Sequence, residues 1–313
     1  MPHRNRTPRN DRVILFISQG DSWYTILVST DRAQLHKRKM DRKFILSSIG
    51  FFLLVSLCSG CAVSPPKDHI VSLPADNCPP WTSAQLKEQV TLFDDTTDTS
   101  TLQCALNFLR NSNEGNIDAS AATAKICFLL ADRTEGDQAR REGFASEGMR
   151  WVERALAQGG EERGDVSYYL AVNLGITVEK HPVAAVKNLD RLVASLEKAL
   201  ALTPDVSRAG PYRVLGMVYL KAPPWPRGIG DGDKALELLR EAVRRSPEYP
   251  LNRIFYARAL WEVEGEEGEQ EITEHLEEAL RLLNQEQWEA VRERWMDDLN
   301  AVAKEVQIDL PGR

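Results

Sequence analysis

Four stretches of this 313-residue chain repeat one spacing of small and apolar residues, and the repeat restricts the fold more than any other feature. The two clearest copies have steps of four, three and five residues: Leu192, Leu196, Ala199 and Pro204, then Ala235, Leu239, Ala242 and Pro247. Two weaker copies are centred on Ala155 and Ala279. Steps of three and four place side chains on one face of an α-helix, and a proline cannot continue the helix. The copies therefore predict helices that each offer a small-residue face to a neighbour.

A second sequence pattern precedes the repeat and predicts the helix that packs against it. Its best copy is Leu215-Gly216-x-x-Tyr219, with weaker copies near Leu170 and Tyr256. The two phrases together resemble the two helices of a tetratricopeptide (TPR) repeat, although the alanines are spaced by 44, 43 and 37 residues instead of 34. Strand-like alternation is almost absent after Trp81, which argues against a β-sandwich or an α/β fold. We expect an all-α, TPR-like helix-pair solenoid over residues 81–313.

The remaining helices are less regular in sequence. Residues 83–111 read as two short helices around the polar segment 94–100, and residues 118–158 as a pair that breaks near 132–136. The last helix is predicted from Gln285 to about Val306, with an apolar stripe suited to a terminal capping helix.

The first sixty residues have the layout of an export signal. Residues 44–60 carry no charge and follow Arg42-Lys43, and they are followed by Cys61. A basic start, a short apolar stretch and small residues are typical of a secretory signal, and 17 residues interrupted by Ser47, Ser48 and Ser56 fall short of a membrane span. A transmembrane anchor is the alternative interpretation.

The segment around Cys61 resembles a bacterial lipobox, in which the cysteine is lipidated and becomes the new N-terminus. The resemblance implies a lipid anchor at Cys61. Because Ala62, and not Asp, follows the cysteine, it also implies a location on the periplasmic face of the outer membrane. A signal that begins at Met40 has ordinary length. We therefore divide the chain into an extension that is non-native or disordered (1–39), a lipoprotein signal peptide (40–60), the lipidated cysteine with a Pro-rich tether (61–80) and the helical domain (81–313).

Charge and side-chain chemistry exclude several functional classes. The net charge is −7, and residues 61–313 alone carry −13, so a nucleic-acid backbone is a poor partner. No zinc-binding spacing and no catalytic motif is present, and we predict a non-enzymatic protein without a metal or cofactor. Cys78, Cys104 and Cys127 allow one disulfide and one free thiol, and the sequence leaves the pairing open, that of Cys104 with Cys127 included.

The loop at residues 221–233 has the most distinctive composition of the chain, with three prolines, three glycines and Trp225. Asp231 and Asp233 there favour helix capping and turn formation over a phosphate loop or a calcium site. Helix-pair solenoids usually bind through their first helices, which predicts a mixed apolar and cationic binding surface. Its candidate residues are Arg213, Met217, Lys221, Trp225, Asn252, Arg253, Arg258 and Trp261.

The run from Gly210 to Asp233, followed by Tyr249-Pro-x-Asn252, resembles the TatT family of lipoproteins associated with TRAP-type solute transporters. The likeness covers roughly residues 165–285. It implies a TPR-like protein that engages a periplasmic solute-binding subunit and holds a small anionic solute or passes it between partners. We therefore expect a lipid-anchored, protein-binding scaffold of the cell envelope, either as an accessory of a TRAP-type transporter or, alternatively, as an outer-membrane or cell-wall assembly scaffold without ligand transport. A closed, apolar cavity would favour the first role and an open groove the second.

Overall fold

The computed structural model describes residues 12–13, 28–29, 70–73, 78–111 and 116–310. These residues are all-α apart from two dipeptide strands, β1 (Arg12–Val13) and β2 (Val28–Ser29), which form a two-stranded sheet. The α-helices are α2 (Ser83–Leu92), α3 (Thr99–Asn111), α4 (Ile117–Asp132), α5 (Gln138–Ala157), α6 (Gly164–Val178), α7 (Pro182–Leu202), α8 (Val206–Lys221), α9 (Gly232–Arg245), α10 (Pro250–Glu264), α11 (Glu269–Leu283) and α12 (Arg292–Glu305). Short 3-10 turns are η1 (Gly160–Glu162), η2 (Gly265–Gly268) and η3 (Glu286–Trp288). The all-α prediction is confirmed.

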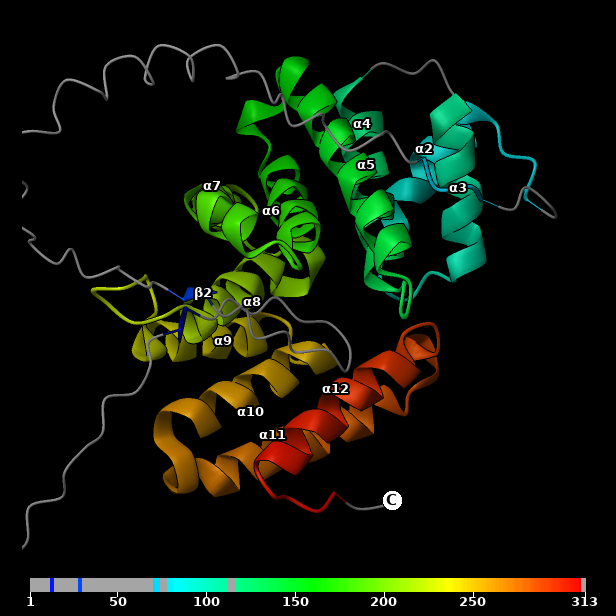
Figure 1. Cartoon of the computed structure of the whole chain (residues 1–313). Helices are drawn as coiled ribbons and strands as arrows, with labels where there is room; N and C mark the ends of the chain where they lie inside the picture. Colours follow the sequence, from blue (N-terminus) through cyan, green and yellow to red (C-terminus); the bar gives the residue numbers. More distant parts are fainter. Residues whose placement is uncertain (1–11, 14–27, 30–69, 74–77, 112–115, 311–313) are drawn as a thin grey trace, which may run out of the picture. The chain divides into compact units, whose positions relative to one another are not determined.

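Consecutive helices pack as neighbouring pairs (Figure 1). The pairs are α4 with α5, α6 with α7, α8 with α9, and α10 with α11. The repeated small residues lie at these contacts: Ala199, Ala242 and Ala279 are fully buried. A Cβ on Gly216 of α8 would lie 2.7 Å from Leu239 Cγ of α9, so only glycine allows that approach. The sequence repeat therefore marks where helices touch.

Helix ends follow local capping chemistry. Thr82 and Gln85 form a capping box at α2, and the side chains of Asn116 and Asp231 accept hydrogen bonds from the backbone at the starts of α4 and α9. The predicted final helix begins later than expected. The chain forms the turn η3 first, and α12 starts at Arg292, because Trp288 is fully buried and anchors the turn in the core.

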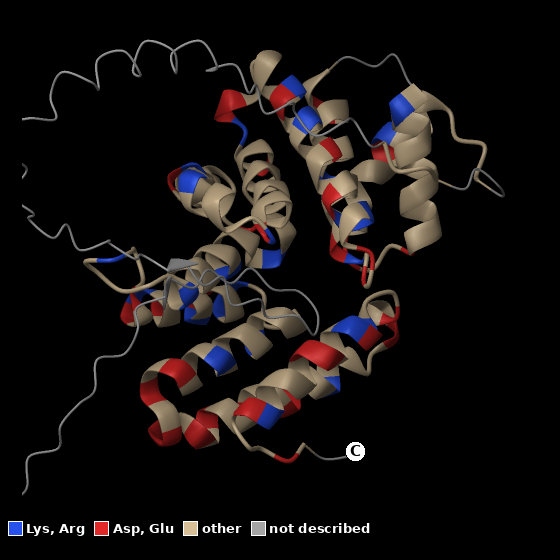
Figure 2. Ribbon diagram, viewed as in Figure 1, with Lys and Arg blue, Asp and Glu red and all other residues tan. Residues whose placement is uncertain are grey.

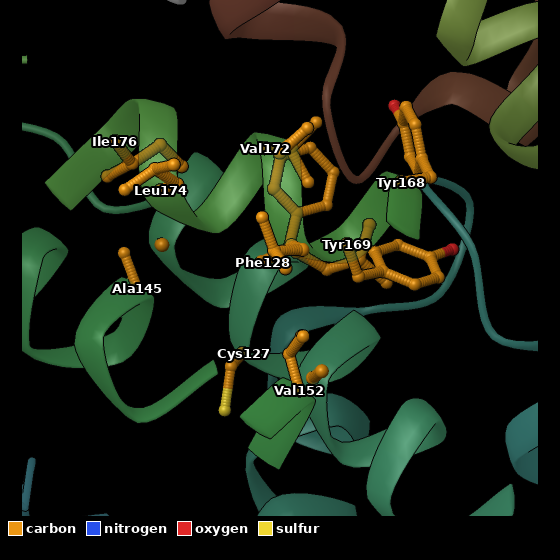
Figure 3. Close-up of a cluster of buried hydrophobic side chains, with 14 of the residues drawn as sticks. Cys127, Phe128, Ala145, Val152, Tyr168, Tyr169, Val172, Leu174 and Ile176 are labelled. Atoms are coloured by element: carbon orange, nitrogen blue, oxygen red, sulfur yellow. The ribbon is translucent and has the colours of Figure 1, made fainter. Parts of the chain in front are cut away.

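Buried side chains form two hydrophobic clusters. The first lies mainly among α2–α8, and Figure 3 shows its centre, where Phe128, Tyr168 and Tyr169 pack together. The Tyr168 and Tyr169 rings meet edge to face at 5.2 Å between centroids. The second cluster lies in α9–α12 and centres on Trp288 and Trp295, whose ring centroids are 5.3 Å apart.

The start of α8 is strained. Ser207, Arg208 and Ala209 all have left-handed backbone angles, with φ between 52° and 62°. A left-handed conformation costs a non-glycine residue roughly 1–2 kcal/mol. The right-handed part of the helix begins after this turn, close to Pro211, whose ring suits the first turn of a helix.

A disulfide joins Cys78 to Cys104, and Cys127 is a buried free thiol. The possible pairing of Cys104 with Cys127 is therefore not the one formed. The predicted extension, signal peptide, lipidation site Cys61 and most of the tether lie outside the described residues. None of the helices in the described part of the chain combines the length and the apolar character needed to cross a bilayer.

Candidate functional site: a cavity among α2, α3, α4 and α6

A cavity of about 430 Å³ lies among α2, α3, α4 and α6. We call it the α2–α6 cavity. Its volume lies within the range of natural small-molecule pockets. It opens in the part of the chain where the sequence repeat is weakest.

The walls of the α2–α6 cavity are mainly apolar. They are formed by Leu86, Val90, Phe108, Leu109, Ala121, Ala122, Tyr169 and Val206. The space exists because α4 presents alanines where a core helix would ordinarily present larger side chains. Four of its residues between Ile117 and Lys125 are alanines. The Tyr169 ring closes one side and belongs to the aromatic centre of the first hydrophobic cluster (Figure 3).

Lys125 supplies a positive charge to this apolar space. Its ammonium group donates to the backbone oxygen of Thr91 at 3.3 Å and forms no ion pair with a carboxylate of the described residues. Burial lowers the pKa of Lys125, and the more distant carboxylates of Asp94, Asp165 and Asp95 offset part of that effect. A lysine at an apolar wall attracts an anionic group, because its partly buried ammonium has lost part of its hydration and has no carboxylate partner among the described residues.

Arg163 is also at the cavity, but its charge is already balanced. Its guanidinium donates to both carboxylate oxygens of Asp165, at 2.8 and 2.6 Å, and to Asp118 at 2.7 Å. These hydrogen bonds raise the pKa of Arg163. Lys125 therefore differs from Arg163 in having donor capacity left for a ligand.

A second, smaller cavity of about 70 Å³ lies behind the aromatic centre. Tyr168 and Phe128 line it, whereas the adjacent Tyr169 lines the α2–α6 cavity. Two predicted residues, Arg213 and Met217, line this smaller cavity together. The aromatic centre thus faces a cavity on each side.

Arg213 is buried and has structural partners. It donates to Asn252 Oδ1 at 2.8 Å and to the backbone oxygens of Arg208 and Ser207, and it stacks on Tyr249 at 4.6 Å from the ring centroid. Burial acts to lower its pKa, but the nearby Tyr249, Tyr168 and carboxylates leave it raised. Arg213 and Asn252, both from the predicted binding surface, therefore hold the left-handed turn in place.

The other predicted binding residues differ in their surroundings. Lys221 pairs with Glu262, and Arg258 is buried and pairs with Glu305 at 3.3 Å. Arg253 donates to the backbone oxygen of Pro247 and contacts His275. Trp261 packs partly against the second hydrophobic cluster, whereas Trp225 is 85% exposed.

Sequence reasoning missed Lys125 and a buried polar network. In that network the Tyr249 hydroxyl donates a hydrogen bond to the Asp95 carboxylate at 2.8 Å. The Arg294 guanidinium of α12 pairs with the Asp132 carboxylate and also donates to the backbone oxygen of Asp132 at 2.7 Å. Burial raises the pKa of Asp95. The signal for Lys125 is its position as the one charge in the apolar run 119–131. The network left no such signal, because its partners lie 154 and 162 residues apart.

No protein-family model and no curated protein matches the chain. Within the ranges that the structure describes, no three His, Cys, Asp or Glu side chains are grouped so as to hold a metal ion.

Proposed function

We propose that this chain is a lipid-anchored, TPR-like protein of the cell envelope that binds partner proteins and holds a small organic anion as an accessory of a TRAP-type solute transporter. The observation that carries the ligand-holding role is the α2–α6 cavity, with apolar walls and Lys125 inside it. A scaffold that only grips a protein tail would need an open groove in its place.

The packing of α6–α11 supports the TPR-like part of the proposal. In a TPR unit two antiparallel helices approach closely through small residues, and successive units stack. The contact of Gly216 with Leu239 and the burial of Ala199, Ala242 and Ala279 follow that arrangement. The lipid anchor is supported by the sequence around Cys61.

The anionic ligand is supported by the chemistry of Lys125. An organic anion places its charged group on the ammonium and its apolar part against Leu86, Val90 and Phe108. Such a pairing offsets the hydration that the partly buried ammonium has lost.

The partner part of the proposal is tested by a pull-down from crosslinked cells with the protein tagged at its C-terminus. We expect the wild type, but not a Cys61→Ala variant, to recover a periplasmic solute-binding subunit or a transporter subunit. Recovery of outer-membrane or cell-wall assembly proteins would assign the alternative role of assembly scaffold. Equal recovery of cytoplasmic proteins by both forms would contradict export.

The ligand part is tested on the purified protein by native mass spectrometry and analysis of the molecules it releases. We expect an organic anion that is retained by the wild type and lost, by at least about tenfold in occupancy, from Lys125→Met. Lys198→Met is the matched control, because Lys198 lies on α7, lines neither cavity and pairs with the exposed Glu162. An anion retained equally by all three proteins would contradict a role for Lys125.

A further inference from the structure

Trp225 is the most exposed large hydrophobic side chain among the described residues, at 85%. It lies at the tip of the loop between α8 and α9, where Pro224, Pro226 and Arg227 are also exposed. Neither of the two cavities includes Trp225. Among the described residues, this indole is therefore mostly exposed and lines neither cavity.

The loop holds Trp225 on an ordered support. The Gly230 amide donates to the Pro223 oxygen at 2.8 Å, and the Arg227 amide donates to the Pro224 oxygen at 3.1 Å. The Asp231 amide donates to the Tyr219 oxygen at 3.0 Å, which ties the end of the loop back to α8. Because the backbone is already fixed, a partner that binds Trp225 pays little entropy to order it.

The base of the loop lies against the end of α10. A Cβ added to Gly232 would lie 3.0 Å from Val263 Cγ2, and Lys221 pairs with Glu262. The base of the loop therefore lies at the end of α10, directly before the turn η2 that connects α10 to α11.

This connection is strongly acidic (Figure 2). Between Arg258 and Arg281 the chain carries nine glutamates and no lysine or arginine. Glu264, Glu266, Glu267 and Glu269 are all exposed at or next to η2. The indole thus belongs to a loop whose base meets an acidic turn, and Arg227 is the exposed cation next to it in the loop.

We propose that Trp225 and the acidic η2 turn form a docking surface for a protein whose binding site is an apolar pocket for the indole with basic side chains at its rim. This inference rests on the proposed function in that it specifies the chemistry of the partner protein. Tryptophan is a frequent interface hot spot when it enters a desolvated pocket, and complementary charge speeds and orients the encounter. An anionic lipid surface would be repelled by the same glutamates.

The first experiment places a photo-crosslinking amino acid at position 227, next to an intact Trp225, in the full-length chain in intact cells. We expect an adduct with one protein that has a basic surface, and none from the same residue placed at position 92, an exposed apolar position on α2. Adducts with lipid alone, or no adduct beyond that of the position 92 control, would overturn the proposal.

The second experiment uses the partner protein that crosslinking identifies. That protein is purified without a crosslink, and its binding to the full-length chain is measured. We expect Trp225→Ala to weaken binding by roughly 30-fold or more. The triple variant Glu264→Lys/Glu266→Lys/Glu267→Lys should slow association about tenfold at low salt, with the difference shrinking at high salt. Matched controls are Leu92→Ala and a charge reversal of the exposed Glu286, Glu289 and Glu293, which should bind like the wild type.

The same measurements separate this inference from the proposed function. If Lys125→Met loses the cavity anion but still binds the partner protein, the docking surface is independent of the anion-binding role. The docking surface would be overturned if the partner bound Trp225→Ala as tightly as the wild type and if binding did not depend on salt. This holds even if the organic anion in the cavity and the lipid anchor at Cys61 are both detected.

Discussion

The regions α2–α5 and α6–α11 are both built from packed helices, but they are held together differently. In α6–α11 each helix finds its main partner next to it in the sequence, through buried small residues such as Gly216 and Ala242. In α2–α5 the pair α4–α5 is also local, but other ties reach far along the chain. The pairing of Asp132 with Arg294 is the clearest, and the Cys78–Cys104 disulfide adds a covalent tie with a sequence separation of 26.

This difference explains where the cavity lies. Stacked pairs with small residues at their contacts close tightly, as Leu239 does on Gly216. Where the elements are fixed by a disulfide and by polar contacts to distant helices, they need not fill all the space between them. The α2–α6 cavity therefore occurs in the region with the less regular packing.

The largest test of the comparison removes a long-range tie. Arg294→Met should destabilise the protein by about 3–5 kcal/mol, because it leaves the Asp132 carboxylate buried without its cation. Urea unfolding checks the loss, and the double variant Asp132→Asn/Arg294→Met should recover part of it. Arg244→Met, which breaks a pair with Glu241 at an exposed arginine, should change stability by less than about 1 kcal/mol. Equal losses for the two arginines would contradict the comparison.

Removing the disulfide is the next test. The double variant Cys78→Ala/Cys104→Ala should lose about 3 kcal/mol, since the crosslink closes a loop with a sequence separation of 26. Hydrogen exchange should show the loss of protection in α2 and α3, with α8–α11 less affected. Reduction of the wild type should reproduce the pattern. A uniform loss across all helices would mean that the two regions unfold as one unit.

The sequence predicted the α6–α11 region well because its information is local. The residues that touch there, such as Leu215 and Gly216 in α8 and Leu239 in α9, belong to repeated phrases within one helix pair. The helix pairs of the first region were also placed correctly, from their polar breaks. The late start of α12 was not predicted, because burial of Trp288 depends on tertiary contacts with Tyr249 and Trp295.

The candidate site was much less predictable than the fold. The helix positions of Arg213 and Asn252 predict a binding surface, whereas the structure buries both residues, where they hold the left-handed turn. A sequence pattern reports which face of a helix a residue occupies, but not what covers that face. Lys125 was readable as a lone charge in an apolar helix, yet its cavity depends on how α2 and α6 meet α4.

A third test compares two glycines within the regular region. Gly216→Ala should cost about 1–3 kcal/mol, because the new methyl group meets Leu239 Cγ at 2.7 Å and neither helix can move freely. Gly268→Ala meets only the flexible Glu264 carboxylate and Ile272 at 3.4 Å or more, and should be close to neutral. Thermal unfolding of the two variants checks the difference. A tolerated Gly216→Ala would show that α8 and α9 pack less tightly than their contacts imply.

The smallest expected effect is a pH dependence of the unfolding free energy that arises from His275 in the α10–α11 pair. Burial lowers the pKa of His275 on α11, and Arg253 of α10, which donates to its Nδ1 at 3.2 Å, lowers it further. Glu271 and Glu274 act in the opposite direction. Because the folded protein disfavours the charged imidazole, the stabilisation is present above the unfolded pKa of about 6.5 and is lost as the pH falls through the lower folded value.

The His275 contribution is measured as the difference between wild type and His275→Gln in unfolding free energy, followed from pH 8 to pH 5. We expect the wild type to lose up to roughly 1 kcal/mol more than the variant over this range. Asp95 and Glu179, whose pKa values burial raises, titrate in both proteins and cancel in the difference. Parallel curves would mean that the α10–α11 contact leaves His275 free to take up a proton. The local pairing that distinguishes this region would then exclude water less completely than the burial of His275 indicates.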